Sequence, residues 1–234
     1  MERIKIIDNL RGIAFLFMVF QHIFYFYDVS NNYQTSFASM DIVNYSGLFA
    51  RVLFILLSGY SVYMNYEKDK DKDKDKNLNV VKRAKRSFEI LMHGFVITLV
   101  TYILYPQYFV KFGILHFLAV GTLLVSFLAP YKLLSVIVLF VIMNITYPKI
   151  NPYVDVVTGA GASSFMMDWF PLNKWLPLLL SGLVLGQTIP TTSLPPILDF
   201  DNFITDIGKN SLNFYTIHLV VLLVFYKVLN LKLS

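Results

Sequence analysis

The sequence predicts an all-α fold, a polytopic bundle of transmembrane helices that forms one domain over residues 1–234. Two observations predict this fold class. Of the 234 residues, 56% are hydrophobic, including 21 Phe and 15 Tyr, and the mean hydropathy is +0.58, which is more apolar surface than one soluble core of this size can bury. The apolar residues also fall in runs that can cross a bilayer, so a soluble protein is excluded.

The charge and the cysteine content narrow the function classes further. The net charge of +5 does not indicate nucleic-acid binding, because the basic residues gather in loops between apolar runs, where they orient a membrane protein. The lack of cysteine excludes disulfides, thiolate catalysis and cysteine-based metal sites. We therefore expect the lipid bilayer as a partner and no nucleic acid.

The apolar runs predict seven membrane spans. In chain order they are 7–27, 47–66, 87–105, 112–129, 131–147, 172–189 and 211–230. Most of them are close to the minimum length of a span, so the helices should be only slightly tilted.

The first apolar run, 3–27, carries internal charges and shows no cleavage pattern, so it is expected to be a retained span and not a signal peptide. Asp8, Arg11 and His22 lie in it at spacings of three and eleven residues, which put all three on one face of a helix. The rise of 1.5 Å per residue places His22 about 16 Å beyond Arg11. An imidazole is thus carried deep into the membrane.

The loops predict the orientation of the chain. Segment 28–46 contains no Lys or Arg, whereas 67–86 is strongly basic, so the positive-inside rule places the N-terminus and 67–86 in the cytoplasm of a multi-pass cell-membrane protein. Within this segment, 67–80 alternates Lys with Asp and has little to bury, so we predict a disordered charged cytoplasmic loop. Its basic continuation could instead tether the chain to anionic lipids.

Two further polar segments separate predicted spans. The outer segment 148–171 leads into the sixth span, and Trp169 and Trp175 near this boundary suit anchors at the membrane interface. The inner segment 190–210 contains several Pro and Asp residues, which argue against another span there.

All four histidines, His22, His93, His116 and His218, fall inside predicted spans. A membrane histidine can act solely as a hydrogen bond between helices. Ionisable groups are costly in a membrane, however, and usually mark a functional path. No H-x-x-x-H pair occurs, so no metal site is predicted, and histidines at several depths suggest a polar passage through the bundle.

The chemistry of the first span suits group transfer. A neutral imidazole such as that of His22 can take a proton from a hydroxyl or an amine. Arg11 suits a phosphate or a carboxylate, and it can also pair with Asp8, three residues earlier on the same helix. An arginine at the cytoplasmic end, with a base deeper on the same face, would suit an anionic activated donor that enters from the cytosol.

Five stretches of the chain resemble, in order, the motifs of one known family. They are IDNLRGIAFLFMVFQH, RVLFILLSGYSVY, FGILHFLAVGTLL, DWFPLNKWLPLLLSGLVLG and GKNSLNFYTIHL. They resemble the heparan-alpha-glucosaminide N-acetyltransferase catalytic-domain family, which is related to the membrane acyltransferases of type 3. Arg11 and His22 reproduce the R-x10-H spacing of the first helix in those acyltransferases.

The resemblance implies an acyltransferase that moves an acetyl or other short acyl group from cytosolic acyl-CoA to an extracytoplasmic sugar, glycan or amino sugar. The transfer can be to oxygen or to nitrogen. Acyl-CoA is the donor substrate, and no permanently bound cofactor is implied. By position it implies that His22 is the catalytic histidine, as base or acyl carrier, and that Arg11 is its partner toward the donor. The candidates for binding donor or acceptor are Asp8, Arg51, His116, Asp168, Trp169 and His218. Arg51 is a candidate because it lies near the outer end of the second span, where it could hold the acceptor or the transferring carbonyl, or snorkel to the interface.

The sequence also departs from the family pattern. Lysosomal members place an asparagine where His22 stands and use a histidine in the following luminal loop, but 28–46 contains no histidine. Lys174 replaces a proline of the family motif. Longer relatives have ten or more spans, so part of their site is absent from seven spans, and a homodimer is one arrangement that would complete it. Two alternatives stay open: a small proton-linked transporter that uses the histidines, and a non-catalytic membrane scaffold.

Overall fold

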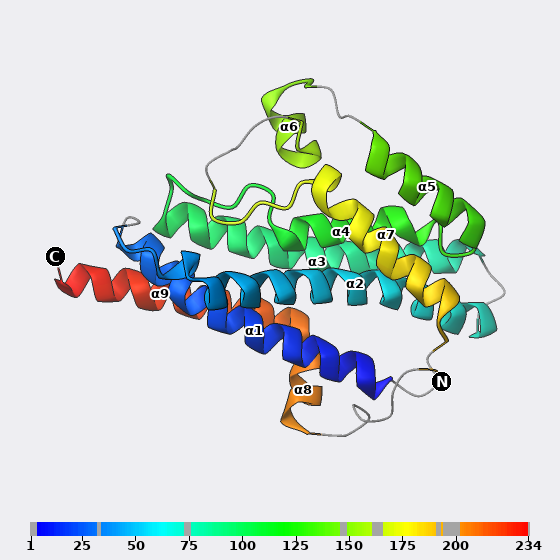
Figure 1. Ribbon diagram of the computed structural model, residues 1–234, viewed down its shortest axis with the longest axis horizontal. Helices are drawn as coiled ribbons and strands as arrows, with labels where there is room; N and C mark the ends of the chain where they lie inside the picture. The colour runs from blue at the N-terminus through cyan, green and yellow to red at the C-terminus, as the bar shows by residue number, and fades with distance from the viewer. Residues whose placement is uncertain are drawn as a thin grey trace. The chain divides into compact units, whose positions relative to one another are not determined.

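The computed structural model describes residues 4–31, 34–72, 76–145, 149–160, 166–190, 193 and 202–233, and this part of the chain is mostly helical (Figure 1). In chain order the elements are α1 (Lys5–Ser30), η1 (Phe37–Ser39), α2 (Asp41–Lys72), α3 (Lys76–Leu104), α4 (Ile114–Ser126), α5 (Lys132–Asn144), α6 (Pro152–Thr158), α7 (Leu172–Thr188), α8 (Phe203–Lys209) and α9 (Ser211–Leu233). The predicted all-α class is confirmed.

Each of the seven predicted spans overlaps one helix, but the helices differ in their capacity to cross a membrane. Four are long and apolar enough to span: α1, the part Asp41–Asp69 of α2, the part Val81–Leu104 of α3, and Ser211–Leu229 of α9. The helices α4 and α5 have 13 residues each, and α7 has 17. A 13-residue helix is only about 20 Å long, against about 30 Å for the hydrocarbon core, so the number seven is not confirmed.

The charged segment predicted to be disordered lies largely in helices. Helix α2 continues through Lys72 and α3 begins at Lys76, and 73–75 lie outside the described residues. A helix forms its hydrogen bonds within its own backbone, so a segment can be helical even when none of its side chains packs against the protein. For this reason a charged repeat can extend a helix. The disorder of 67–80 stays a prediction.

The short helices α6 and α8 were not predicted, although each has local start signals. In α6, the Asn151 side chain accepts hydrogen bonds from the N–H groups of Tyr153 and Val154, and Pro152 is the first helical residue. Gly159 ends this helix at φ 85°, a left-handed conformation that favours glycine. The N-cap of α8 is Asn202, whose side chain accepts the backbone N–H of Thr205. Both helices therefore lie within the polar segments that separate predicted spans.

The helices divide into two compact units. The terminal unit contains Glu2–Phe54, Leu99–Pro106 and Pro195–Ser234, and the central unit contains Ile55–Thr98 and Gln107–Leu194. The helices α1, α8 and α9 belong to the terminal unit, whereas α4, α5, α6 and α7 belong to the central unit. Both α2 and α3 contribute to each unit.

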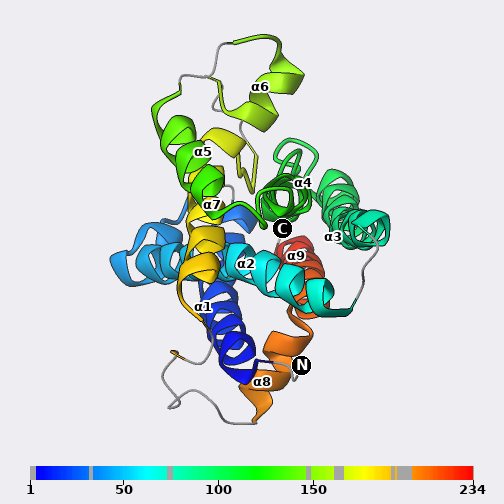
Figure 2. The same ribbon diagram turned by 90° about the vertical axis from the view of Figure 1, so that its right-hand side faces the viewer.

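In the terminal unit, α1 packs against both α8 and α9 (Figures 1 and 2). The backbones of α1 and α8 are in direct contact, because a Cβ atom on Gly12 would collide with the main chain of Ile204, and one on Gly208 would collide with the main chain of Asp8. These two glycines fix the close approach. Small residues of this kind let the backbones of two helices approach closely and gain van der Waals contact.

In the central unit, α7 packs against α4, α5 and α6. It also approaches the part of α2 that belongs to this unit, since a Cβ on Gly59 would meet the carbonyl oxygen of Leu179, and one on Gly182 would meet that of Leu56. At the end of α7, Gln187 donates hydrogen bonds to the carbonyl groups of Leu128 and Ala129, in the turn that follows α4. The central unit is thus built on one helix with small residues along its contact face.

Candidate active site

Two histidines of the terminal unit form a direct hydrogen bond. Nδ1 of His22 on α1 lies 3.0 Å from Nε2 of His218 on α9. The two imidazole rings are stacked, with centroids 5.3 Å apart and planes inclined by 22°. Both side chains are half-buried, so neither ring is fully enclosed by the unit. We call His22 and His218 the histidine pair.

Aromatic side chains hold the rings of the histidine pair. Phe26, one turn further along α1, stacks on His22 at 5.4 Å. Phe15 and Tyr215 meet His218 edge-on at 5.0 and 5.4 Å. Nδ1 of His218 lies 3.0 Å from the carbonyl oxygen of Phe214 in the preceding turn of α9. Ring contacts and hydrogen bonds together restrict the rotation of both imidazoles.

Arg51 on α2 lies within electrostatic range of His22. Its Nε donates a hydrogen bond of 3.0 Å to the carbonyl oxygen of Gly47. Gly47 in turn packs against Gln21, the neighbour of His22 in the sequence, because a Cβ at this glycine would strike the Gln21 side chain. The structure therefore joins two predicted site residues, His22 and His218, and places the positive charge of Arg51 where it acts on His22.

Arg11 and Asp8 form the predicted ion pair near the start of α1. Nη1 of Arg11 lies 3.1 Å from Oδ1 of Asp8, and the side chains are 22% and 2% exposed. Helix geometry keeps Arg11 about 16 Å below His22 along the same element. The ion pair is thus separate from the histidine pair, and a role of Arg11 in binding the donor stays a prediction.

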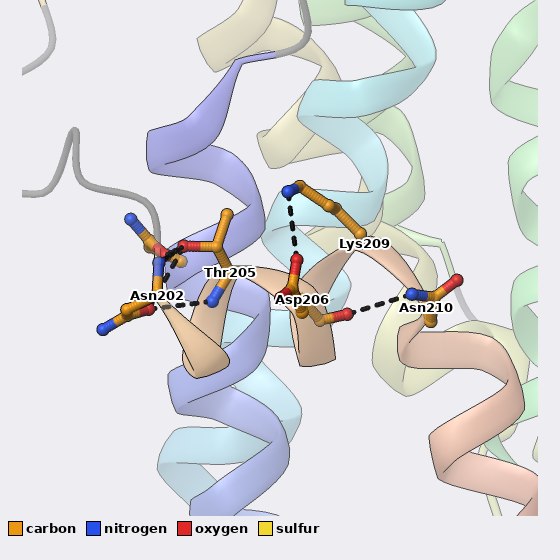
Figure 3. Close-up of polar contacts among 6 residues, drawn as sticks. Asn202, Thr205, Asp206, Lys209 and Asn210 are labelled. Atoms are coloured by element: carbon orange, nitrogen blue, oxygen red, sulfur yellow. Dashed lines mark hydrogen bonds and ion pairs between the residues drawn. The ribbon is translucent and has the colours of Figure 1, made fainter.

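A second polar cluster joins α8 to α1 beside this ion pair. The hydroxyl of Thr205 donates to Oδ1 of the fully buried Asn9 at 2.5 Å. Thr205 and Asn202 cap α8 reciprocally, each side chain accepting from the other's backbone N–H at 3.1 Å (Figure 3). On the exposed side of α8, Lys209 pairs with Asp206. Sequence analysis missed Asn9 and Thr205, although Asn202-x-x-Thr205 is a recognisable capping signal.

His116 and Asp168 meet at the first turn of α4 in the central unit. Nδ1 of His116 accepts the backbone N–H of Gly113 at 3.3 Å, and Oδ2 of Asp168 accepts that of Ile114 at 2.9 Å. Nε2 of His116 lies 3.4 Å from the hydroxyl of Thr98. Both predicted candidates thus satisfy backbone donors that a helix start would leave unpaired. A role of either residue in binding donor or acceptor stays a prediction.

Trp169 ties the segment before α7 to α6. Its Nε1 donates a hydrogen bond of 2.8 Å to the carbonyl oxygen of Val156. Its backbone forms an isolated parallel bridge with Phe112, just before α4. Trp175 is 7% exposed and packs on Phe170, with ring centroids 4.8 Å apart. Both tryptophans therefore contribute to packing of the central unit.

An open apolar groove of about 630 Å³ runs between α1 and α2 in the terminal unit. Its lining residues are Leu16, Phe17, Phe20, Ile42, Tyr45, Ser46 and Phe49. At 100° per residue, Phe20 and His22 are about 200° apart around α1. The groove and the histidine pair therefore lie on different faces of this helix.

Among the described residues, no three His, Cys, Asp or Glu side chains group as metal ligands would.

Apolar helices that can cross a bilayer, with ionisable side chains joined inside them, define a membrane protein with a polar site between its spans. The chain belongs to the family described as heparan-alpha-glucosaminide N-acetyltransferase, catalytic, whose family model matches residues 3–220. This confirms the family that the sequence motifs indicated, and it makes the chain a member of a family of membrane acetyltransferases. No curated protein and no solved structure matches the chain.

Proposed function

We propose that this chain transfers an acetyl group from cytosolic acetyl-CoA to a hydroxyl or amine of an extracytoplasmic sugar or glycan, with His22 as the proton acceptor. The observation that supports this proposal best is a half-buried imidazole, hydrogen-bonded to a second imidazole inside the spans of an acetyltransferase family member. Imidazole is the commonest general base in proteins. Membrane-embedded ionisable groups are costly and therefore tend to be retained for function.

In the proposed reaction, the acceptor oxygen or nitrogen attacks the carbonyl carbon of the thioester while Nε2 of His22 takes its proton. The new C–O or C–N bond replaces the C–S bond, and coenzyme A leaves as a thiolate that takes up a proton. The guanidinium of Arg51, within electrostatic range of His22, would meet the negative charge that develops on the carbonyl oxygen. A short-lived acetyl group on His22 is the alternative course of the same transfer.

Arg11 is proposed to bind the donor. A guanidinium suits the phosphate groups of coenzyme A, because it presents planar paired donors and keeps its charge. Its pairing with Asp8 fixes its position, and its side chain is 22% exposed. The spacing of about 16 Å to His22 is compatible with a long donor that reaches the base with its acyl end.

The decisive experiment supplies labelled acetyl-CoA to the purified protein in lipid nanodiscs, with a panel of amino sugars and cell-wall glycans. We expect transfer of label to at least one acceptor, and a loss of about a hundredfold or more in kcat for His22→Ala, as for removal of a general base. Ile23→Ala is the matched control, since this neighbouring side chain is 39% exposed. No transfer to any acceptor, or equal transfer by His22→Ala, would contradict the proposal.

A further inference from the structure

We infer that His218 is a positioning residue that holds His22 in the tautomer with its proton on Nδ1, so that Nε2 of His22 carries the free lone pair. The tautomer follows from contacts of the terminal unit alone. Its consequence for catalysis rests on the proposed function, in which Nε2 of His22 accepts the proton.

The first step concerns His218. Its Nδ1 lies 3.0 Å from the carbonyl oxygen of Phe214. A backbone carbonyl has lone pairs and no hydrogen, so it can only accept a hydrogen bond. The proton in this contact therefore belongs to Nδ1 of His218. A neutral imidazole has one N–H group, which leaves Nε2 of His218 as an acceptor.

The second step carries this assignment across the histidine pair. Nε2 of His218 lies 3.0 Å from Nδ1 of His22. Since the His218 nitrogen is the acceptor, Nδ1 of His22 is the donor. The remaining nitrogen of His22, Nε2, then has no proton of its own. Which ring nitrogen of a histidine is protonated is generally set in this way, by the hydrogen bond that the other nitrogen makes.

The third step links the tautomer to proton transfer. A base needs an unprotonated nitrogen directed at the substrate, and the other tautomer would present an N–H group there instead. When Nε2 of His22 takes a proton from the acceptor, the bond from Nδ1 to His218 persists and stabilises the resulting imidazolium. The logic is that of a carboxylate that orients a catalytic histidine, with an imidazole and a backbone carbonyl in place of the carboxylate.

Nitrogen-15 NMR of histidine-labelled protein in lipid nanodiscs tests the tautomer without any assay of activity, because protonated and unprotonated ring nitrogens have distinct shifts. His22→Gln assigns the signals of His22. We expect His22 as the Nδ1–H form in the native chain, and loss of that form in His218→Leu. The central unit supplies an internal reference: Nδ1 of His116 accepts the N–H of Gly113, so His116 should be the Nε2–H form. A native His22 in the Nε2–H form would overturn the inference.

Two variants test the effect on catalysis. His218→Gln keeps an amide oxygen that can accept the proton of Nδ1 of His22, whereas His218→Leu offers no acceptor. We expect His218→Leu to lower kcat by about a hundredfold or more with little change in KM for acetyl-CoA, and His218→Gln to retain activity within about tenfold of the native chain. Equal losses in both variants, with thermal unfolding unchanged, would overturn the positioning role.

The two readouts separate this inference from the proposed function. If native protein shows the Nδ1–H form of His22 but acetylates no acceptor, the proposed function fails and the tautomer assignment stands. If acetylation depends on His22 while the NMR signals show the Nε2–H form, the assignment fails and the proposed function stands.

Discussion

At the scale of residues, the hydroxyl of Thr205 is a polar group that ties α8 to α1. It donates to the buried Asn9 at 2.5 Å, and no water can easily replace it because both residues are fully buried. We expect Thr205→Val, which keeps the shape, to lower the free energy of unfolding by about 1–3 kcal/mol, the cost of an unsatisfied buried acceptor. Thermal unfolding in detergent measures this loss.

The matched control for that prediction is Thr188→Val at the end of α7. Thr188 is exposed, and its hydroxyl bonds only to carbonyl groups of its own helix. We expect a change within about 0.5 kcal/mol, as for most surface substitutions. Equal stability of the two variants would show that the contact between Thr205 and Asn9 adds nothing to folding.

At the scale of elements, the packing of α8 on α1 depends on direct backbone contact. Because a Cβ on Gly208 would collide with the main chain of Asp8, we expect Gly208→Ala to force the helices apart and to destabilise the protein by about 1–3 kcal/mol, as overpacking does. Asn213→Ala, at an exposed position of α9, should change stability little. If Gly208→Ala unfolds at the same temperature as the native protein, the direct backbone contact between the two helices is contradicted.

At the scale of the whole molecule, the contacts of the terminal unit constrain the number of spans. Asp8 of α1 meets Gly208 of α8, and His22 of α1 bonds to His218 of α9. Helices α1 and α9 therefore run in the same direction. If both cross a membrane, as their length allows, α8 lies on the side where α1 begins. If α2 and α3 cross as their length allows, an odd number of further crossings must lie before α8. Five or seven spans satisfy this condition, whereas four do not.

Cysteine labelling tests this arrangement, since the chain has no native cysteine. We introduce single cysteines at Ser36, Lys68 and Asp206, all of which are exposed. With an impermeant maleimide and intact cells, we expect labelling of Ser36→Cys only, because the positive-inside rule places the other two sites in the cytoplasm. Permeabilised cells, in which all three should react, are the control. Labelling of Asp206→Cys in intact cells would contradict the predicted side of α8.

The site could be predicted from the sequence only in part. The ion pair between Asp8 and Arg11 followed from their spacing of three residues, because neighbours at this distance share a helix face. The hydrogen bond between His22 and His218 joins residues 196 positions apart, and no local spacing reports it. The capping of α4 by His116 was equally hidden, since sequence gives the depth of a residue along a helix but not its rotation about the helix axis.

The sequence by itself determined that this is a helical membrane protein of an acetyltransferase family, because run length, hydropathy and motif order are properties of the chain read in one dimension. It also determined which side chains can take a proton or hold an anion. Only the tertiary structure decided which of them lie together. Helix packing sets the rotation of α1, α2 and α9, and this rotation pairs His22 with His218, brings Arg51 within range, and leaves His116 as the cap of its own helix.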